Sequence, residues 1–179
     1  GARLKKGATS WSTPFLMADT PNLPDCNPIL FLNKDNKLFL VWIAVQANEW
    51  ETSILRFKTS TNYAGSGAPQ WDWQDNMLLN PGNEFHEEVV TKFKALPELH
   101  RGWSTYAATY DEMIIEASKD SKKRTTGWMT RIKPFIYPNG KIVLPLYSDG
   151  FNFSLAAISE DGGSTWLPSA PIVGRGPIQ

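Results

Sequence analysis

The sequence predicts a mainly β fold, made of four-stranded antiparallel sheets with two helices inserted between them. Residues 27–43 and 133–147 repeat one pattern of apolar strands and polar turns. Between these repeats, apolar residues recur at helical spacing instead. Eight tryptophans and thirteen prolines are typical of a β-rich protein with many turns, although stacked aromatic residues also form sugar-binding surfaces.

Each repeat begins with a proline-led apolar strand, turns at a polar pair, and continues with a lysine and a second apolar strand. The turns are Asp35–Asn36 in the first repeat and Asn139–Gly140 in the second. Apolar residues that alternate on both sides of such a turn indicate a β-hairpin. The repeats therefore predict two hairpins of similar construction.

A third strand is expected after each hairpin, at 52–59 and at 153–159. A polar turn follows, and a fourth strand begins at a tryptophan, Trp71 or Trp166. Four consecutive antiparallel strands form a meander, which is the blade unit of a β-propeller. The pattern therefore predicts propeller blades.

Two helices are expected between the repeats, in an insertion at about 83–120. Asn83 is a helix-capping residue, and Pro97 ends the first helix. Ser104 can begin a second helix that runs to about Lys119. Apolar residues are expected to share one face of each helix: Phe85, Val89 and Phe93 in the first, and Tyr106, Tyr110, Met113, Ile114 and Ala117 in the second. The basic stretch 122–124 is interpreted as a solvated loop.

The stretch Ser159-Glu-Asp-Gly-Gly-Ser-Thr-Trp166 has the chemistry of a tightly tied turn. The Asp161 carboxylate can accept hydrogen bonds from backbone N–H groups two residues on. Gly162 and Gly163 tolerate the positive φ that a tight hairpin needs. The hydroxyls of Ser159 and Thr165 can tie the loop, and Trp166 opens the returning strand with a large ring to bury.

This stretch resembles the Asp-box, or BNR repeat, of sialidase-type propellers. The segments Gly127-Trp-Met-Thr-Arg-Ile-Lys-Pro, Pro145-Leu-Tyr-Ser-Asp-Gly and Asp25-Cys-Asn-Pro fit the same family. The resemblance covers residues 12–179 and implies that the chain, 1–179, is one partial propeller domain, about half of a six-bladed propeller. In this family the Asp-box is structural, so Ser159, Asp161, Gly163, Thr165 and Trp166 would stabilise the fold and lie outside the active site.

The resemblance implies a glycoside hydrolase that removes a terminal sialic acid. Three arginines bind the sugar carboxylate, a tyrosine activated by a glutamate is the nucleophile, and an aspartate is the acid and base. Bidentate guanidinium–carboxylate pairs orient an anionic sugar well. A neutral tyrosine avoids repelling that carboxylate.

Arg131 and Lys133 are the candidate substrate-binding cations. They are expected to alternate onto one face of the first strand of a blade, near the central channel. The Thr-Arg-Ile-Lys-Pro sequence around Arg131 loosely resembles the family's Arg-Ile-Pro element. The alternative for Arg131 is an ion pair at the surface or between blades.

Tyr147 and Asp149 are the candidate catalytic residues, because they share a strand face and lead into a loop at Gly150. The alternative is a packed aromatic residue followed by a turn aspartate. Asp25 and Asn27 precede an inner strand and are candidate substrate-binding residues, or caps of a turn. The sequence places neither a full arginine triad nor a tyrosine–glutamate pair.

Composition excludes several other functions. Eighteen basic and eighteen acidic residues give no net charge, so no nucleic-acid partner is expected. No apolar run reaches the ~18 residues of a membrane span, and no signal peptide is visible. One cysteine and two histidines predict no disulfide, no metal site and no cofactor. A location in the cytoplasm, or secretion from a longer precursor, is consistent with these features.

Two functions are therefore expected. The first is a sialidase-like glycoside hydrolase, present here as a fragment, with a glycan as substrate. The second is a non-catalytic propeller module that binds carbohydrate or protein. A truncated product that survives by oligomerising is a third possibility. Half a propeller leaves open blade edges, so self-association, or continuation in a longer chain, is expected.

Overall fold

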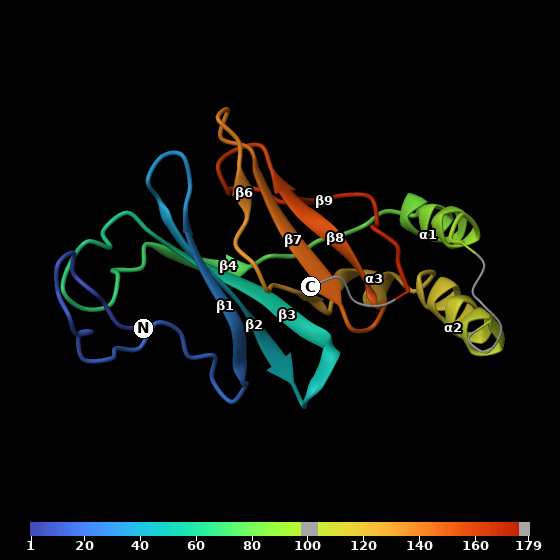
Figure 1. Ribbon diagram of the computed structural model, residues 1–179, viewed down its shortest axis with the longest axis horizontal. Coiled ribbons are helices and arrows are strands. Elements are labelled where there is room, and N and C mark those ends of the chain that lie inside the picture. The colour runs from blue at the N-terminus through green and yellow to red at the C-terminus, as the bar shows by residue number, and fades with distance from the viewer. Residues whose placement is uncertain (98–103, 176–179) are drawn as a thin grey trace.

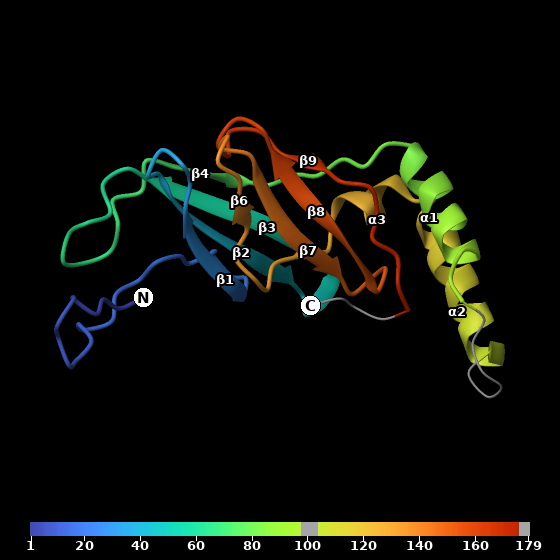
Figure 2. The same ribbon diagram turned by 45° about the horizontal axis from the view of Figure 1, so that its top comes forward.

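The computed structural model describes residues 1–97 and 104–175, with the side chains of 104–107 left out of the description. Two antiparallel sheets lie against each other, and the longer helices lie beyond one end of them (Figure 1). The N-terminal segment lies at the opposite end (Figure 2). The predicted mainly β class is confirmed.

The first sheet contains four strands in the order β1-β2-β3-β4. They are β1 (Asp25–Leu32), β2 (Leu38–Gln46), β3 (Glu49–Ser60) and β4 (Trp73–Asn76). This sheet is the meander that the first repeat predicts. Its fourth strand begins at Trp73 instead of Trp71, because the preceding residues close the long loop: Asp72 accepts bonds from the Thr61 amide and hydroxyl, at 2.6 and 2.8 Å.

The second sheet contains five strands. They are β5 (Trp128–Met129), β6 (Phe135–Ile136), β7 (Ile142–Ser148), β8 (Phe153–Ser159) and β9 (Leu167–Pro168). Both β5 and β6 pair with β7, one at each end of it. The prediction of one continuous first strand through Arg131 and Lys133 is therefore wrong, and Pro134, which has no N–H to donate, lies in the gap.

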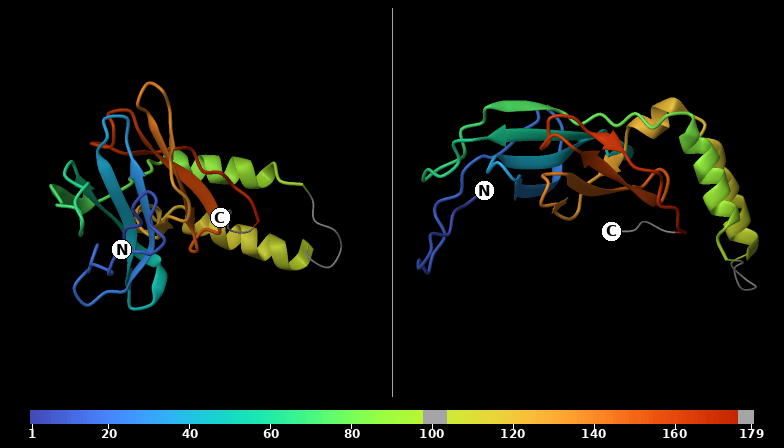
Figure 3. Two further views of the ribbon diagram at one scale, coloured as in Figure 1. Left: turned by 60° about the vertical axis from the view of Figure 1, so that its left-hand side comes forward. Right: turned by 90° about the horizontal axis from the view of Figure 1, so that it is seen from above.

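The core lies between the two sheets. Alternate residues of β2, namely Phe39, Val41, Ile43 and Val45, are buried and belong to one cluster with Leu144 and Leu155 of the second sheet. Figure 3 shows the sheets as two layers with the longer helices beyond one end. Strand periodicity of two explains why these alternate β2 residues share one face.

Helix α1 (Glu84–Lys94) confirms the first predicted helix. Phe85, Val89 and Phe93 are all buried. Phe85 packs against Trp128 and Phe151, with ring centroids at 6.3 and 5.6 Å. The insertion therefore contributes to the same core as the sheets. Asn83 is the residue before the helix, but its side chain makes no capping hydrogen bond.

Helix α2 (Ser104–Ala117) confirms the second predicted helix, although its apolar stripe is narrower than expected. Ile114 is buried, and Tyr110 and Ala117 pack against the core. Met113, which belongs to the predicted apolar stripe, is 58 % exposed, so the stripe is only partly buried. The side chain of Tyr106 lies outside the described residues.

Helix α3 (Ser121–Thr125) replaces the solvated loop expected around 122–124. The Asp120 side chain caps it by accepting from the Lys122 N–H at 2.9 Å. Arg124 is buried and donates to the carbonyl of Gly82 at 2.8 Å. The Trp128 indole donates to the Arg124 carbonyl at 2.8 Å, which anchors the helix to the second sheet. Among the described residues, no helix is both long and apolar enough to cross a bilayer.

Candidate functional site

Arg131 lies in the irregular segment between β5 and β6, and its side chain is exposed. Its Nε donates to the Tyr147 hydroxyl at 3.2 Å, and its guanidinium lies 5.6 Å from the centroid of the Tyr147 ring. No described acidic group forms an ion pair with it. The geometry therefore disfavours the ion-pair interpretation of Arg131 and leaves its terminal N–H groups available to an anion.

Tyr147 is the residue that positions Arg131. It lies near the end of β7, is only 3 % exposed, and pairs with Met129 across the sheet. Its hydroxyl oxygen accepts from Arg131 Nε and also from Asn27 Nδ2, each at 3.2 Å. Two donors on one oxygen, together with the ring beneath the guanidinium, restrict the directions that Arg131 can take.

Asn27 reaches Tyr147 because the backbone of β1 is irregular there. The pairing of β1 with β2 shifts register between Cys26 and Ile29, and Asn27 has a φ of 49°. Such a bulge re-aims a side chain at the edge of a sheet. The Thr130 hydroxyl donates to the Asn27 carbonyl at 2.7 Å and joins the two sheets at this point.

Three of the predicted site residues, Asn27, Arg131 and Tyr147, thus form one cluster from separate parts of the chain. We call it the Arg131 cluster. Thr130, which is buried, also belongs to it, and sequence reasoning missed this residue because a threonine beside an arginine has no distinctive pattern. The cluster can hold an anion with the guanidinium while the tyrosine and asparagine fix its direction.

Asp25 makes a different set of contacts. Its two carboxylate oxygens accept from the Trp42 indole and from the Thr20 amide, each at 2.8 Å. Thr20 also accepts from Arg56 at 2.9 Å. Asp25 therefore holds the N-terminal segment against the first sheet, which agrees with the alternative of a structural role better than with substrate binding.

Asp149 lies beyond the end of β7, and its side chain lines a groove of about 390 Å³. The groove also contains Glu51, Lys122 and Lys123, which the sequence did not associate with the site because they belong to a hairpin and to α3. Tyr147 is thus buried in the Arg131 cluster, whereas Asp149 lines this groove. Lys133 is exposed in the irregular segment and makes no ion pair with a described residue.

The stretch 159–166, called the Asp-box here only for its sequence resemblance, forms the tied turn that its residues predict. Gly162 and Gly163 have φ values of 72° and 100°. Asp161 accepts from the amides of Ser164 and Thr165, at 3.0 and 2.9 Å, three and four residues on instead of two. The Thr165 hydroxyl also binds Asp161, at 2.6 Å, and the Ser159 hydroxyl binds it at 2.8 Å.

These contacts set the charge of the turn. Burial alone would raise the pKa of the Asp161 carboxyl, but the hydrogen bonds from Thr165, Ser159 and Ser164 outweigh it and lower the pKa from 3.8 to about 2. Beside the turn, the hydrogen bond from Lys141 to Glu160 raises the pKa of the Lys141 amine. The Lys141 amine and the Glu160 carboxylate lie 2.7 Å apart. Because its own pKa is lowered, the Asp161 carboxyl is ionised at neutral pH.

The turn also joins the two sheets. Asn33, in the β1–β2 hairpin, donates from Nδ2 to the carbonyl of Gly162 at 2.8 Å. Its side-chain oxygen accepts from the amides of Asp35 and Lys37, which fixes the hairpin. The Asp-box follows the end of β8 that pairs with Ile142, whereas Tyr147 lies toward the opposite end of β7. The turn and the Arg131 cluster therefore lie at opposite ends of the second sheet.

No model of a known protein family matches the chain, and a comparison with curated proteins finds no match either. The described residues contain no group of three or more histidine, cysteine, aspartate or glutamate side chains arranged to hold a metal ion. His86 bonds the Ser118 hydroxyl at 2.7 Å, which gives it a structural contact between α1 and the end of α2. The other histidine, His100, lies outside the described residues.

Proposed function

We propose that the chain forms part of a sialidase-like glycoside hydrolase and that the Arg131 cluster binds the carboxylate of a terminal acidic sugar. The observation that carries this proposal is the exposed Arg131 guanidinium, which has no carboxylate partner among the described residues and is held by Tyr147. An arginine that is fixed in direction but unpaired is suited to bidentate recognition of a carboxylate.

The proposed scaffold is a β-propeller in which the two sheets are neighbouring blades. Two consecutive antiparallel meanders, each with a turn rich in side-chain bonds at its outer end, support it. The Thr130 hydroxyl, just after β5, donates to the Asn27 carbonyl in β1, and this contact between the two sheets supports their arrangement as neighbouring blades. In a propeller the blades surround a central channel, and the Arg131 cluster would face that channel.

Asp149 is the better placed of the two candidate catalytic residues. It is exposed and lines a groove at the same end of β7 as the Arg131 cluster, so a substrate can reach it. Tyr147 is buried, and its hydroxyl already accepts two hydrogen bonds. Tyr147 therefore suits positioning of Arg131 better than attack on a sugar. Lys133 would add a second cation beside the carboxylate.

The proposal includes an assembly, because both sheets expose apolar side chains. On the second sheet Phe135, Tyr137 and Leu167 are exposed, and on the first sheet Leu30 and Leu32 are exposed. Exposed apolar groups on open sheets favour association with another sheet. We propose that a second copy, or further blades of a longer chain, covers these surfaces.

A non-catalytic propeller module that binds an acidic glycan is the second candidate. The burial of Tyr147 favours it, since a nucleophile must contact the substrate. No described glutamate hydrogen-bonds Tyr147 either. This module would keep the anion-binding Arg131 and lack the chemical step.

Hydrolysis of a fluorogenic sialoside, measured on fractions whose mass is determined by light scattering, tests the proposed function. The hydrolase is supported if the fractions that contain an assembled form hydrolyse the sialoside and if the Arg131→Gln variant hydrolyses it more slowly. Binding of sialic acid without turnover in any fraction supports the module. Absence of both would contradict the proposed function.

A further inference from the structure

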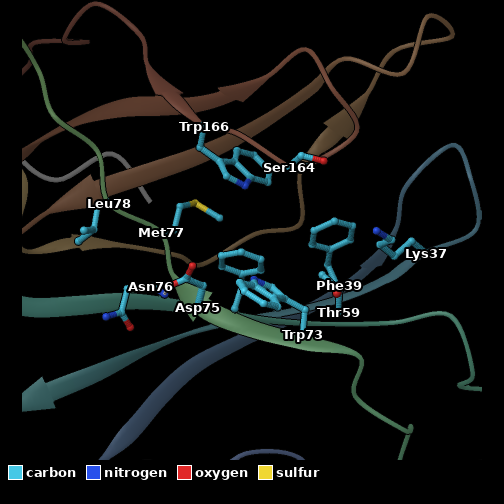
Figure 4. Close-up of a pocket in the computed structure, with 12 residues that line it drawn as sticks. Lys37, Phe39, Thr59, Trp73, Asp75, Asn76, Met77, Leu78, Ser164 and Trp166 are labelled. Atoms are coloured by element: carbon cyan, nitrogen blue, oxygen red, sulfur yellow. Dashed lines mark hydrogen bonds between the residues drawn. The ribbon is translucent and has the colours of Figure 1, made fainter.

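A second pocket lies at the opposite end of the sheets from the Arg131 cluster, between the Asp-box and β4. Its volume is about 440 Å³, within the range of ordinary ligand pockets. We call it the rim groove, and Figure 4 shows it with its side chains. The residues that matter here are Lys37, Phe39, Phe57, Trp73, Asp75 and Trp166.

The rim groove has an aromatic wall that is open to a ligand. Phe39 and Phe57 are buried at its base, with ring centroids 6.4 Å apart, and both belong to the core. Trp73, on the edge strand β4, is 59 % exposed. A tryptophan on a rigid strand offers a flat apolar surface at little cost in side-chain entropy.

Polar groups surround this aromatic wall. Asp75 uses one carboxylate oxygen to accept from the Asn76 amide at 2.7 Å, and its other oxygen has no partner among the described residues. The Lys37 ammonium forms no ion pair with a described residue. The groove thus offers an acceptor and a donor of opposite charge, so its charge attracts neither anions nor cations overall.

Trp166, on the Asp-box side, adds an unsatisfied donor. Its indole N–H is buried and has no hydrogen-bond partner in the described part of the chain. In Figure 4 this nitrogen points toward the space between Trp166 and the side chains of the first sheet. A buried donor without an acceptor is unfavourable, and a ligand oxygen would supply the missing acceptor after a small rotation of the indole.

We propose that the rim groove binds a neutral pyranose sugar, stacked on Trp73. A pyranose has an apolar C–H face for the indole ring, hydroxyls that donate to Asp75, and oxygens that accept from Lys37 and Trp166. The balanced charges disfavour an acidic sugar, in contrast to the Arg131 cluster. This inference does not depend on the proposed hydrolase, because the groove uses none of the residues of that site.

The test is a titration of the whole chain with neutral sugars, followed by the indole N–H signals in ¹H–¹⁵N NMR spectra. Trp73→Phe and Trp166→Phe variants assign the two signals. Methyl β-galactoside, methyl β-glucoside and N-acetylglucosamine are the probes, at up to about 50 mM, since affinities on the order of 1 mM are expected of single sugars. We expect the Trp73 and Trp166 signals to shift together and to saturate with at least one probe.

Variants separate the groove from other surfaces. Trp73→Ala should weaken binding by at least about tenfold, and Asp75→Ala by about fivefold, the loss of one hydrogen bond. Both residues are exposed on an edge strand, so these variants keep the core intact. Trp50→Phe, which lies in β3 and outside the groove, should bind as the wild type does. Absence of saturable shifts with all three probes, or shifts that persist in Trp73→Ala, would overturn the proposal.

Discussion

The ring of Phe39 in the first sheet occupies the space that a side chain at residue 163 would need. A Cβ atom built on Gly163 would lie 2.5 Å from Cζ of Phe39, and Gly163 has a φ of 100°. Phe39 is buried in the core and cannot move aside easily. The Asp-box turn therefore connects the two sheets through close packing as well as through the bond from Asn33 to the Gly162 carbonyl.

Gly163→Ala should destabilise the protein by about 2–4 kcal/mol, because it combines a clash in the core with an unfavourable positive φ. Chemical denaturation monitored by tryptophan fluorescence measures this change. Gly65→Ala is the matched control, since nothing lies within 4 Å of its Cβ position and its φ is not positive. A change for Gly163→Ala no larger than that of the control would contradict the packing account.

Asp161 should make stability depend on pH in the acid range. Its pKa is lowered from 3.8 to about 2 in the folded chain, so the unfolded chain binds the proton more readily. Its stabilising contribution is therefore present above pH 3.8 and is lost as the pH falls toward 2. Because the side chain is exposed, we expect on the order of 1 kcal/mol.

Asp161→Asn tests this dependence. The variant should be less stable at pH 7, and the difference from the wild type should shrink as the pH falls through the same range. Thermal unfolding of both proteins at several pH values between neutral and acid measures this difference in stability. A difference that stays constant with pH would show that the charge of Asp161 contributes nothing.

Helix α1 should unfold together with the sheets, because it shares their aromatic cluster. Phe85 is 2 % exposed and contacts Trp128, Phe151 and Phe153. Phe85→Ala should cost about 3–5 kcal/mol. Met113→Ala, at an exposed helical position, should change stability by less than about 0.5 kcal/mol. Separate unfolding transitions for helix and sheet would contradict a single domain over 1–179.

Tyr147→Phe should weaken binding of an acidic sugar without removing the cation. The variant keeps the ring beneath Arg131 and deletes the oxygen that accepts from Arg131 and Asn27. Loss of one such hydrogen bond corresponds to about a fivefold lower affinity. Isothermal titration with N-acetylneuraminic acid measures it, and Tyr63→Phe, in a loop of the first sheet, is the control. Unchanged affinity would remove the positioning role from Tyr147.

The sequence predicted the elements that depend on local pattern. The first meander, helix α1 and the tied Asp-box turn all follow from residue spacing and turn chemistry, although the predicted cap of α1 at Asn83 is not made. The break between β5 and β6 did not follow, although Pro134 signals it, because alternation through Arg131 and Lys133 looks like a continuous strand. The burial of Arg124 also depends on a tertiary partner, the Gly82 carbonyl.

The candidate site was predictable only as separate pieces. Motif resemblance picked out Asn27, Arg131 and Tyr147, but their meeting depends on the bulge at Cys26–Ile29, which has no clear sequence signal. Asp25 is predicted as a site residue together with Asn27 because both precede an inner strand, yet it hydrogen-bonds Trp42 and Thr20. A register shift of this kind changes the directions in which nearby side chains point, so residues close in the sequence contact different partners.

The most direct test compares the binding of N-acetylneuraminic acid with that of its methyl ester, for the wild type, Arg131→Gln and the control Lys6→Gln. The ester replaces the negative charge that Arg131 is proposed to bind with a neutral methyl ester and leaves the rest of the sugar unchanged. We predict that the wild type and Lys6→Gln prefer the acid by at least about tenfold, and that Arg131→Gln loses this preference. Equal affinity of the wild type for acid and ester, or a preference that Arg131→Gln retains, would contradict the account.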